Sequence, residues 1–409
     1  MTFFSKLLVL ECASVLAGPA VGAMFAELGA TVIKLEPLGG DVTRSWKLAS
    51  EAPANDVSAY FSCVNWGKYS LALDLKRAEG REIARRLAAK ADVLIANYKP
   101  GAAERLGMDY AGLAALNPGL IYAHLTGYGP DDPRTGYDAL IQAESGFLYL
   151  NARPGEEPVR LPVALIDLLA AHQLKEAVLV ALLERQTEQK GKYLQVSLIQ
   201  SALASLANQA ANWLVAGQEP RPLGLEHPNI APYGSLYQTA DGRQLMLAVG
   251  SDAQFAALAR LLDAPQLATD PCFAANAGRV RQREALQAEL RPLIATRQAD
   301  ELLAALWRAE IPAGRVQTVS QALAQPAAAD LLIQADDLKG LRTCLYGPNP
   351  PLRPPPSLGA DSTHILQHWL NFDQATCEEL AQNGVIKIKG RVARDEGRGK
   401  DEEVLPPRP

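Results

Sequence analysis

A single carboxylate, that of Asp167, stands within an apolar run that extends from Leu161 to Ala171. A carboxylate among aliphatic neighbours loses its hydration, and this desolvation is unfavourable unless hydrogen-bond donors or a shifted pKa compensate for it. Two interpretations are open: Asp167 caps the helix that the following residues predict, or it is a reactive group. The residue context alone favours the cap, because aspartate is a preferred N-cap residue.

A second group of polar side chains follows the predicted ends of neighbouring strands. The segment Asn97–Gly101 brings an amide, an aromatic ring and a cation just past an apolar run, and ligands of open α/β sheets bind at the carboxyl ends of strands. Arg105, Lys76 and Arg77 lie near such ends and are candidates to hold a phosphorylated ligand whose base stacks on Tyr98. Taken singly, each cation is better explained as solvated surface charge.

Two further motifs narrow the chemistry. The turn Gly136–Asp138 contains a phenol and a carboxylate. These groups stand at the entrance of a site, or Tyr137 is buried and its hydrogen bond to a carboxylate fixes the loop. Gly18–Gly22 follows a strand and opens a helix but does not complete the G-x-G-x-x-G fingerprint, so a nicotinamide enzyme is not expected. These glycines are better explained by close packing of the first helix on its strand.

Alternating strands and helices provide the frame for these side chains. Short apolar runs predict parallel strands, and segments of helical periodicity separate them. This βαβ repeat predicts a doubly wound, Rossmann-like α/β sheet. The predicted strands are 7–10, 31–36, 70–74, 92–96, 120–125 and 193–198, and the predicted helices are 20–28, 80–91, 168–188 and 199–215.

The second half of the chain changes character after a proline-broken linker at 218–224. Two strand-like runs joined by the turn Ala240–Arg243 predict a hairpin. We expect a large α/β domain formed by 1–217 and 321–386, a smaller α+β domain at 218–320, and a charged, disordered tail at 387–409. The remaining predicted elements are strands at 233–237 and 244–249, helices at 253–262, 282–296, 362–370 and 373–382, a return near 311–314, and a proline-rich crossing at 348–356.

Composition places the chain among soluble globular proteins. Its 409 residues are 48% hydrophobic and 21% charged, which suffices for a large core. A net charge of -5 argues against a nucleic-acid partner. The cysteines are scattered without C-x-x-C or metal spacing, and the N-terminus shows neither a signal peptide nor a long apolar span. We expect a cytoplasmic protein with reduced thiols, no bound metal and no membrane association.

Ordered blocks of sequence give the chain a family likeness: Val15–Pro19, Leu28–Pro37, Gly40–Arg44, Asn97–Gly101, Glu104–Gly107, Gly136–Ala139, His227–Tyr233, Ile311–Gly314 and Leu358–Thr363. Over nearly its whole length the chain resembles the family III CoA-transferases, the group of formyl-CoA transferase and carnitine CoA-transferase. The catalytic aspartate of that family falls on Asp167. The resemblance therefore reverses the preference for a helix cap and implies a nucleophile.

The resemblance also implies a mechanism. The aspartate attacks the thioester of an acyl-CoA to form a mixed anhydride, the CoA thiolate then forms an aspartyl-CoA thioester, and an incoming acid reverses these steps. The apolar run around Asp167 would strip hydration from the carboxylate, and backbone N–H groups would stabilise each oxyanion. No metal or redox cofactor is needed, because the coenzyme A thioester is itself a substrate.

Several binding residues follow from the same resemblance. Tyr137 is expected beside the reacting centre and, with His227 and Arg44, is a candidate to hold a distal substrate carboxylate. The expected contacts to coenzyme A are Leu73, Lys76, Asn97, Tyr98, Arg105 and Leu106.

This sequence departs from the formyl-CoA members at three places. Pro37 stands where they carry an arginine, Leu16 replaces a glutamine near the substrate, and the short segment Gly224–Asn229 takes the place of their glycine-rich flap. The shorter version is more similar to the branch that acts on dicarboxylic acids such as succinate and glutarate. We therefore expect transfer of CoA from an acyl-CoA such as succinyl-CoA to a small dicarboxylic acid, not to oxalate.

Two alternatives share the fold. An α-methylacyl-CoA racemase would carry a histidine in place of Tyr137, and a phenol with a pKa of about 10 is poorly suited to exchange a proton at the α-carbon. A non-catalytic CoA-binding relative would have no reason to keep Asp167 in an apolar segment. Family members form homodimers of interlinked, ring-like chains, and the connections at 218–224 and 348–356 are compatible with that assembly here.

Overall fold

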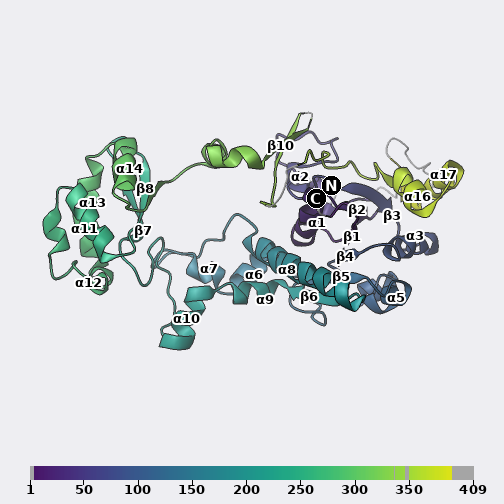
Figure 1. The fold of residues 1–409 in the computed structure, drawn as a ribbon, viewed down its shortest axis with the longest axis horizontal. Coiled ribbons are helices and arrows are strands. Elements are labelled where there is room, and N and C mark those ends of the chain that lie inside the picture. The colour runs from purple at the N-terminus through teal and green to yellow at the C-terminus, as the bar shows by residue number, and fades with distance from the viewer. Residues whose placement is uncertain (1–3, 336, 346–349, 389–409) are drawn as a thin grey trace, which may run out of the picture. The chain divides into compact units, whose positions relative to one another are not determined.

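The computed structural model describes residues 4–335, 337–345 and 350–388, and the chain folds into two compact units (Figure 1). The first contains Met1–Ile141, Ala164–Ser205 and Leu331–Pro409, and the second contains Gln142–Val163 and Leu206–Asp330. The sequence prediction placed 142–163 in the large domain and set the boundaries at 217 and 320. Residues 389–409 of the expected tail lie outside the described residues, and Lys387 belongs to a strand.

The first unit is built on a seven-stranded sheet with the order β12-β3-β2-β1-β4-β5-β6. All neighbouring strands are parallel except β12, which is antiparallel to β3. The chain order of the sheet reverses between β1 and β4, which makes this the topological switch point of a doubly wound fold. The strands are β1 Leu8–Cys12, β2 Thr31–Glu36, β3 Tyr69–Leu73, β4 Val93–Ala96, β5 Ile121–Thr126, β6 Tyr193–Ser197 and β12 Ile386–Lys387.

Helices cover both faces of this sheet. Side chains alternate along β1, so Leu8, Leu10 and Cys12 pack with α3, α5, α16 and α17 on one face. The other face packs against α1 and α8, which also contact each other. The helices of this unit are α1 Ala17–Glu27, α2 Ala59–Ser62, α3 Ala78–Ala88, α4 Ala102–Arg105, α5 Tyr110–Leu116, α8 Leu165–Glu188, α9 Leu198–Ala204, α16 Ser362–Leu370 and α17 Gln374–Gln382, with a 3-10 turn at Val42–Ser45 and a hairpin of β10 Leu332–Ala335 and β11 Leu338–Leu341. Helix α6 Asp138–Glu144 begins in this unit, and its residues from Gln142 on belong to the second.

Glycine allows α1 to approach β1 closely. A Cβ atom at Gly18 would collide with Ala13, and one at Gly22 would collide with the carboxylate of Glu11. The interpretation of these two glycines as packing residues is therefore confirmed.

One predicted helix is wrong, because the segment 199–215 forms two helices. The first, α9, ends at Ala204, and the hydroxyl of the next residue, Ser205, donates to the carbonyl of Ser201 at 2.7 Å, a bond that bends helices. Ala207 then takes a positive φ of 46°, which interrupts the helical repeat. The second helix, α10 Ala207–Ala216, belongs to the other unit.

The second unit is a small α+β assembly whose bounds differ from the predicted 218–320. An antiparallel sheet of β7 Tyr233–Gln238, β8 Gln244–Ala248 and β9 Ala313–Arg315 includes the predicted hairpin. Its core joins the sheet to α11, α13 and α14. The other helices are α7 Phe147–Leu150, α11 Asp252–Leu261, α12 Asn276–Arg281, α13 Arg283–Ala295, α14 Ala299–Arg308 and α15 Val319–Leu323, with 3-10 turns at Pro265–Ala268 and Pro326–Leu331.

Candidate active site

A cavity of about 210 Å³ lies in the first unit at the carboxyl ends of its central strands. Its wall is formed by Ser14–Ala17 after β1, Asn97–Pro100 after β4, Leu125–Gly127 at the end of β5, and Gly129, Asp132 and Arg134–Tyr137 beyond it, together with Asp167 and Leu198. The switch point between β1 and β4 is where open α/β sheets bind ligands. Four of the predicted site residues, Asn97, Tyr98, Tyr137 and Asp167, line this cavity.

Asp167 lies in the first turn of α8 and is 8% exposed. It does not cap the helix, which corrects the first interpretation of this residue. The cap is supplied from a distance by Asp138, whose Oδ2 accepts the N–H of Ile166 at 2.8 Å and that of Asp167 at 3.4 Å. Within the described residues no donor is hydrogen-bonded to the Asp167 carboxylate. This carboxylate is therefore open to the cavity.

The surroundings of Asp167 disfavour its charge. Burial, and after it the negative charge of Asp138, raise the pKa of Asp167 from 3.8 to about 7. Near neutral pH the protonated and ionised forms therefore coexist. A carboxylate with poor solvation and a repelling neighbour is more reactive as a nucleophile than one in water.

Two tyrosines stand near this carboxylate. Tyr137 lines the cavity and is 53% exposed, so the alternative of a buried tyrosine that pins the loop is wrong. Tyr60 on α2 was not predicted. Burial raises the pKa of Tyr60 to about 12, and the negative charge of Asp167 contributes. Its phenol therefore stays protonated beside the site, and no sequence motif marks it.

Asn97 and Tyr98 tie the cavity wall to the sheet. The Asn97 amide accepts from the N–H of Ser14 at 3.2 Å and donates to the carbonyl of Ser14 at 3.0 Å, which joins the loops after β4 and β1. The Tyr98 hydroxyl contacts the thiol of Cys12 in the core, and burial raises the pKa of Tyr98. The Tyr98 ring packs against the core cluster, which leaves it poorly placed for the predicted stacking on a base.

The other predicted coenzyme A contacts do not line the cavity. Leu73 is buried at the end of β3, and Leu106 packs against the same core. Lys76 and Arg105 are exposed after β3 and at the end of α4, at the carboxyl edge of the sheet. A ligand that extends along this edge would meet their charges outside the cavity.

The prediction for Arg44 needs correction. Its guanidinium pairs with both carboxylate oxygens of Glu36 at 2.7 Å, donates to two carbonyls and lies 3.7 Å above the ring of Phe61. This arrangement leaves Arg44 unavailable to a substrate. Its partner precedes it by eight residues in sequence and is not apparent from the motif. His227 lies in the second unit, where its ring contacts Tyr233.

Two other cationic side chains, Arg134 and Lys99, line the cavity. Arg134 lines it from an exposed loop, pairs with Asp132 at 2.9 Å and stacks 3.7 Å above the ring of Tyr128. Lys99 also lines it and donates to the hydroxyl of Thr135 at 2.6 Å. Sequence reasoning missed Arg134, although its position two residues before Gly136 was a usable signal.

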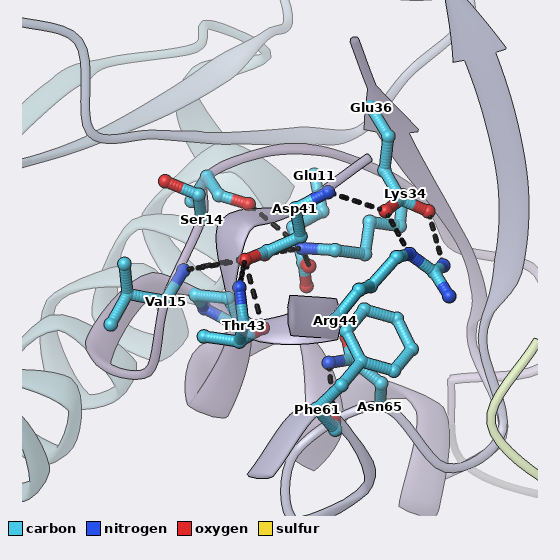
Figure 2. Close-up of polar contacts among 12 residues, drawn as sticks. Glu11, Ser14, Val15, Lys34, Glu36, Asp41, Thr43, Arg44, Phe61 and Asn65 are labelled. Atoms are coloured by element: carbon cyan, nitrogen blue, oxygen red, sulfur yellow. Dashed lines mark hydrogen bonds and ion pairs between the residues drawn. The ribbon is translucent and has the colours of Figure 1, made fainter. Parts of the chain in front are cut away.

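A buried network of charges lies behind the cavity wall (Figure 2). Glu11 pairs with Lys34 at 3.0 Å and with Lys68 at 2.7 Å, and Lys34 also pairs with Asp41 at 2.9 Å. Burial opposes the charge of Lys34, but Glu11 and Asp41 raise its pKa above the ordinary value. Burial lowers the pKa of Lys68 to about 8 against the opposing effect of Glu11. The network is therefore held by mutual pairing rather than by water.

The described part of the chain contains no group of three or more histidine, cysteine or acidic residues that could hold a metal ion. In the same residues no helix has both the length and the apolar character needed to cross a bilayer. The five cysteines form no disulfide.

Comparisons with known proteins agree with this arrangement. The sequence model of CoA-transferase family III matches residues 4–362. The chain is 37% identical over 383 residues to the succinate–glutarate CoA-transferase of Agrobacterium fabrum, covering 88% of this chain and 94% of that protein. It is 36% identical over 340 residues to the acetyl-CoA:oxalate CoA-transferase of Acetobacter aceti, covering 81% and 86%.

A solved structure supports the same relationship. The crystal structure of a CAIB/BAIF family protein from Brucella suis superposes with a TM-score of 0.79 and 38% sequence identity, covering 90% of this chain and 99% of the other. The two chains therefore share their fold over nearly all of the sequence. With the family match, the relatives and the cavity at the switch point together, this chain belongs to CoA-transferase family III and is a CoA-transferase.

Proposed function

We propose that this enzyme moves CoA from an acyl-CoA such as succinyl-CoA to a small dicarboxylic acid, with Asp167 as the nucleophile. One observation carries the proposal: the Asp167 carboxylate is buried without a hydrogen-bond donor among the described residues, in the wall of the switch-point cavity. The relative from Agrobacterium fabrum is a succinate–glutarate CoA-transferase, which supports the choice of acids.

The proposed reaction begins with attack on the thioester. A carboxylate oxygen of Asp167 bonds to the acyl carbon, the C–S bond breaks and the CoA thiolate leaves. The thiolate attacks the aspartyl carbonyl of the mixed anhydride, which releases the first acid and leaves an aspartyl-CoA thioester. The second acid repeats these steps in reverse and regenerates the Asp167 carboxylate. The sequence is redox-neutral and transfers no proton overall, so we propose that the thioester is the only coenzyme that takes part.

The environment of Asp167 favours this chemistry. Its anhydride and thioester forms are neutral, so acylation removes both the desolvation and the repulsion from Asp138 that raise its pKa. Burial therefore disfavours the free carboxylate more than the covalent intermediates. The effect lowers the barrier between them without a metal or an additional base.

The cations of the cavity fit the second carboxylate of a dicarboxylic acid. Arg134 and Lys99 both line the wall that contains Asp167, and an arginine pairs with a carboxylate through two parallel hydrogen bonds. We propose that Arg134 holds the distal carboxylate, with Tyr137 as a neighbouring donor. The phosphates of CoA would extend toward Lys76 and Arg105 at the carboxyl edge of the sheet.

Mass spectrometry tests the proposal directly. The protein is incubated with succinyl-CoA and a panel of dicarboxylic acids, and a new acyl-CoA is expected. Asp167→Ala should abolish transfer, and hydroxylamine should trap an acyl-CoA-dependent adduct at Asp167 in the native enzyme. The control Asp373→Asn alters a carboxylate that caps α17 and should leave transfer unchanged. Exchange of the α-proton without any CoA transfer would instead favour the racemase.

We also propose that the active form is an interlinked homodimer. The chain leaves the first unit, builds the second and returns more than once. Helix α10 buries none of its residues, and Trp213, Leu214 and Val215 at its end are exposed, as expected for a surface that a partner covers. Light scattering should give twice the chain mass, and a monomer at micromolar concentration contradicts the proposal.

A further inference from the structure

Val15 has an uncommon backbone conformation in the wall of the cavity. Its φ is +72°, in the left-handed region, and it lines the same cavity as Asp167. A β-branched residue is a genuine outlier there, because its side chain crowds its own backbone. Such conformations persist only where the surrounding structure holds them in place, and they concentrate at functional sites.

The holding contacts come from the buried network rather than from the cavity (Figure 2). Both oxygens of Asp41 accept the N–H of Val15, at 3.4 and 3.3 Å. Lys34 donates to the carbonyl of Ala13 at 2.9 Å, two residues earlier, and pairs with the same Asp41. The adjacent Ser14 is held by Asn97. The segment is therefore fixed at Val15 and at the two residues before it.

Asp41 is itself held in one orientation. Its Oδ1 accepts the N–H of Thr43 at 3.0 Å and the hydroxyl of Thr43 at 2.8 Å, while its Oδ2 faces Lys34. Both Asp41 and Lys34 are buried. A pair of buried charges contributes little net stability, because desolvation offsets the attraction between them. The pair does, however, fix the positions of the main-chain groups that it binds, the N–H of Val15 and the carbonyl of Ala13.

We propose that Asp41, with Lys34, is a positioning residue of the transferase: it holds Val15 in the left-handed conformation and so fixes the wall Ser14–Ala17 of the cavity that contains Asp167. This inference rests on the proposed reaction at Asp167. A wall displaced by about 1 Å is enough to slow a reaction by about a hundredfold. The wall also carries the first N–H groups of α1, so its position sets the polar surface that the reacting acyl group meets.

A rescue experiment tests the role. Asp41→Asn leaves one oxygen to serve Lys34, Thr43 and Val15, and kcat for transfer from succinyl-CoA should fall by about 10- to 100-fold. Val15→Gly permits the left-handed conformation without strain, and the kcat of this single variant is the reference for the double variant. In the double variant it should restore most of the activity that Asp41→Asn loses. Val15→Ala, which keeps the strain, should not rescue.

Two further variants keep the test decisive. If Asp41→Asn does not fold, Thr43→Val loosens the same carboxylate without removing its charge, and its smaller loss of kcat should also be rescued by Val15→Gly. Glu27 is the matched control, a buried acid that accepts the N–H groups of Thr343 and Cys344 outside the cavity lining. Glu27→Gln should lower the Tm without lowering kcat.

The outcomes separate this inference from the proposed function. A double variant as slow as Asp41→Asn alone, or an Asp41→Asn enzyme with native kcat, overturns the positioning role while transfer by the native enzyme still stands. If the Asp167→Ala variant retains full turnover, the proposed function fails instead, whatever the Asp41 variants do.

Discussion

Asp138 accepts the main-chain N–H of Asp167 at 3.4 Å, and its negative charge also helps to raise the pKa of the Asp167 side chain. One carboxylate thus caps α8 and destabilises the anion of the other. The two effects act on different groups of the same residue. The backbone of the nucleophile is held in place while its side chain is left poorly solvated and reactive.

The pH dependence of transfer should follow Asp167. Burial and Asp138 place its pKa at about 7, and only the ionised form attacks the thioester. We expect kcat/KM to rise tenfold per pH unit below about pH 7 and to level off above it. The measurement is a pH profile from about 4.5 to 9 at constant ionic strength. An acidic limb centred near pH 4 would show that Asp167 titrates as an ordinary carboxyl.

Asp138→Asn should shift the acidic limb of the pH profile of kcat/KM to lower pH. Removal of the neighbouring charge lowers the pKa of Asp167, but not to the ordinary value, because burial is the larger cause. The plateau of kcat should fall by less than about tenfold, since the weaker repulsion makes the carboxylate a poorer nucleophile. The amide still accepts the N–H of Ile166, so stability should fall by about 1 kcal/mol or less. A limb that does not move would remove Asp138 from the electrostatics of the site.

Local sequence patterns predicted the frame of the molecule well. The predicted bounds of β2 and α16 agree with the structure, and the six parallel strands of the large sheet lie within a few residues of their predicted positions, whereas β12 was not predicted. Buried parallel strands are short apolar runs, so their signal is local. The apolar run also singled out Asp167, but it favoured a helix cap, and only the family resemblance implied a nucleophile.

The site residues that were wrongly assigned have partners that local sequence patterns do not reveal. Asp138 takes the capping role assigned to Asp167, and the N–H groups that it accepts lie across α6 and α7 in the chain. Arg44 resembled a ligand-binding arginine because its pairing with Glu36 appears only when the chain has folded. Val15 carries no sequence signal for a positive φ, since glycine is the usual residue there. Tertiary contacts decide each of these cases.

Asp167→Asn should abolish transfer and stabilise the fold. The pKa of Asp167 is raised on folding, so the native state binds a proton more tightly than the unfolded chain, and native stability is lost as pH rises from about 4 to 7. An asparagine at this position does not ionise, so the variant does not lose this stability as pH rises. We expect the variant to exceed the native protein by about 2–4 kcal/mol above pH 7 and by little near pH 4.

Urea unfolding at pH 4.5 and pH 8 measures this difference. Asp373→Asn is a control in which the pH dependence of stability should have the opposite sign. Hydrogen bonds from Thr376 lower the pKa of Asp373. Removal of this carboxylate should therefore destabilise the protein more at pH 8 than at low pH. Equal stability of Asp167→Asn and the native protein at both pH values would show that the carboxylate is well solvated.

Arg134→Gln should change which acids are accepted. Arg134 lines the cavity with Asp167, and a distal substrate carboxylate would lose its charge-assisted pair. Because the side chain is 57% exposed, we expect only a five- to tenfold rise in KM for a dicarboxylic acceptor. KM for a monocarboxylic acid of the same length and kcat for both should change little. Lys192→Gln, which breaks a surface ion pair before β6, is the control and should affect neither acid. An equal loss with both acids would assign Arg134 to the binding of CoA rather than to the choice of acid.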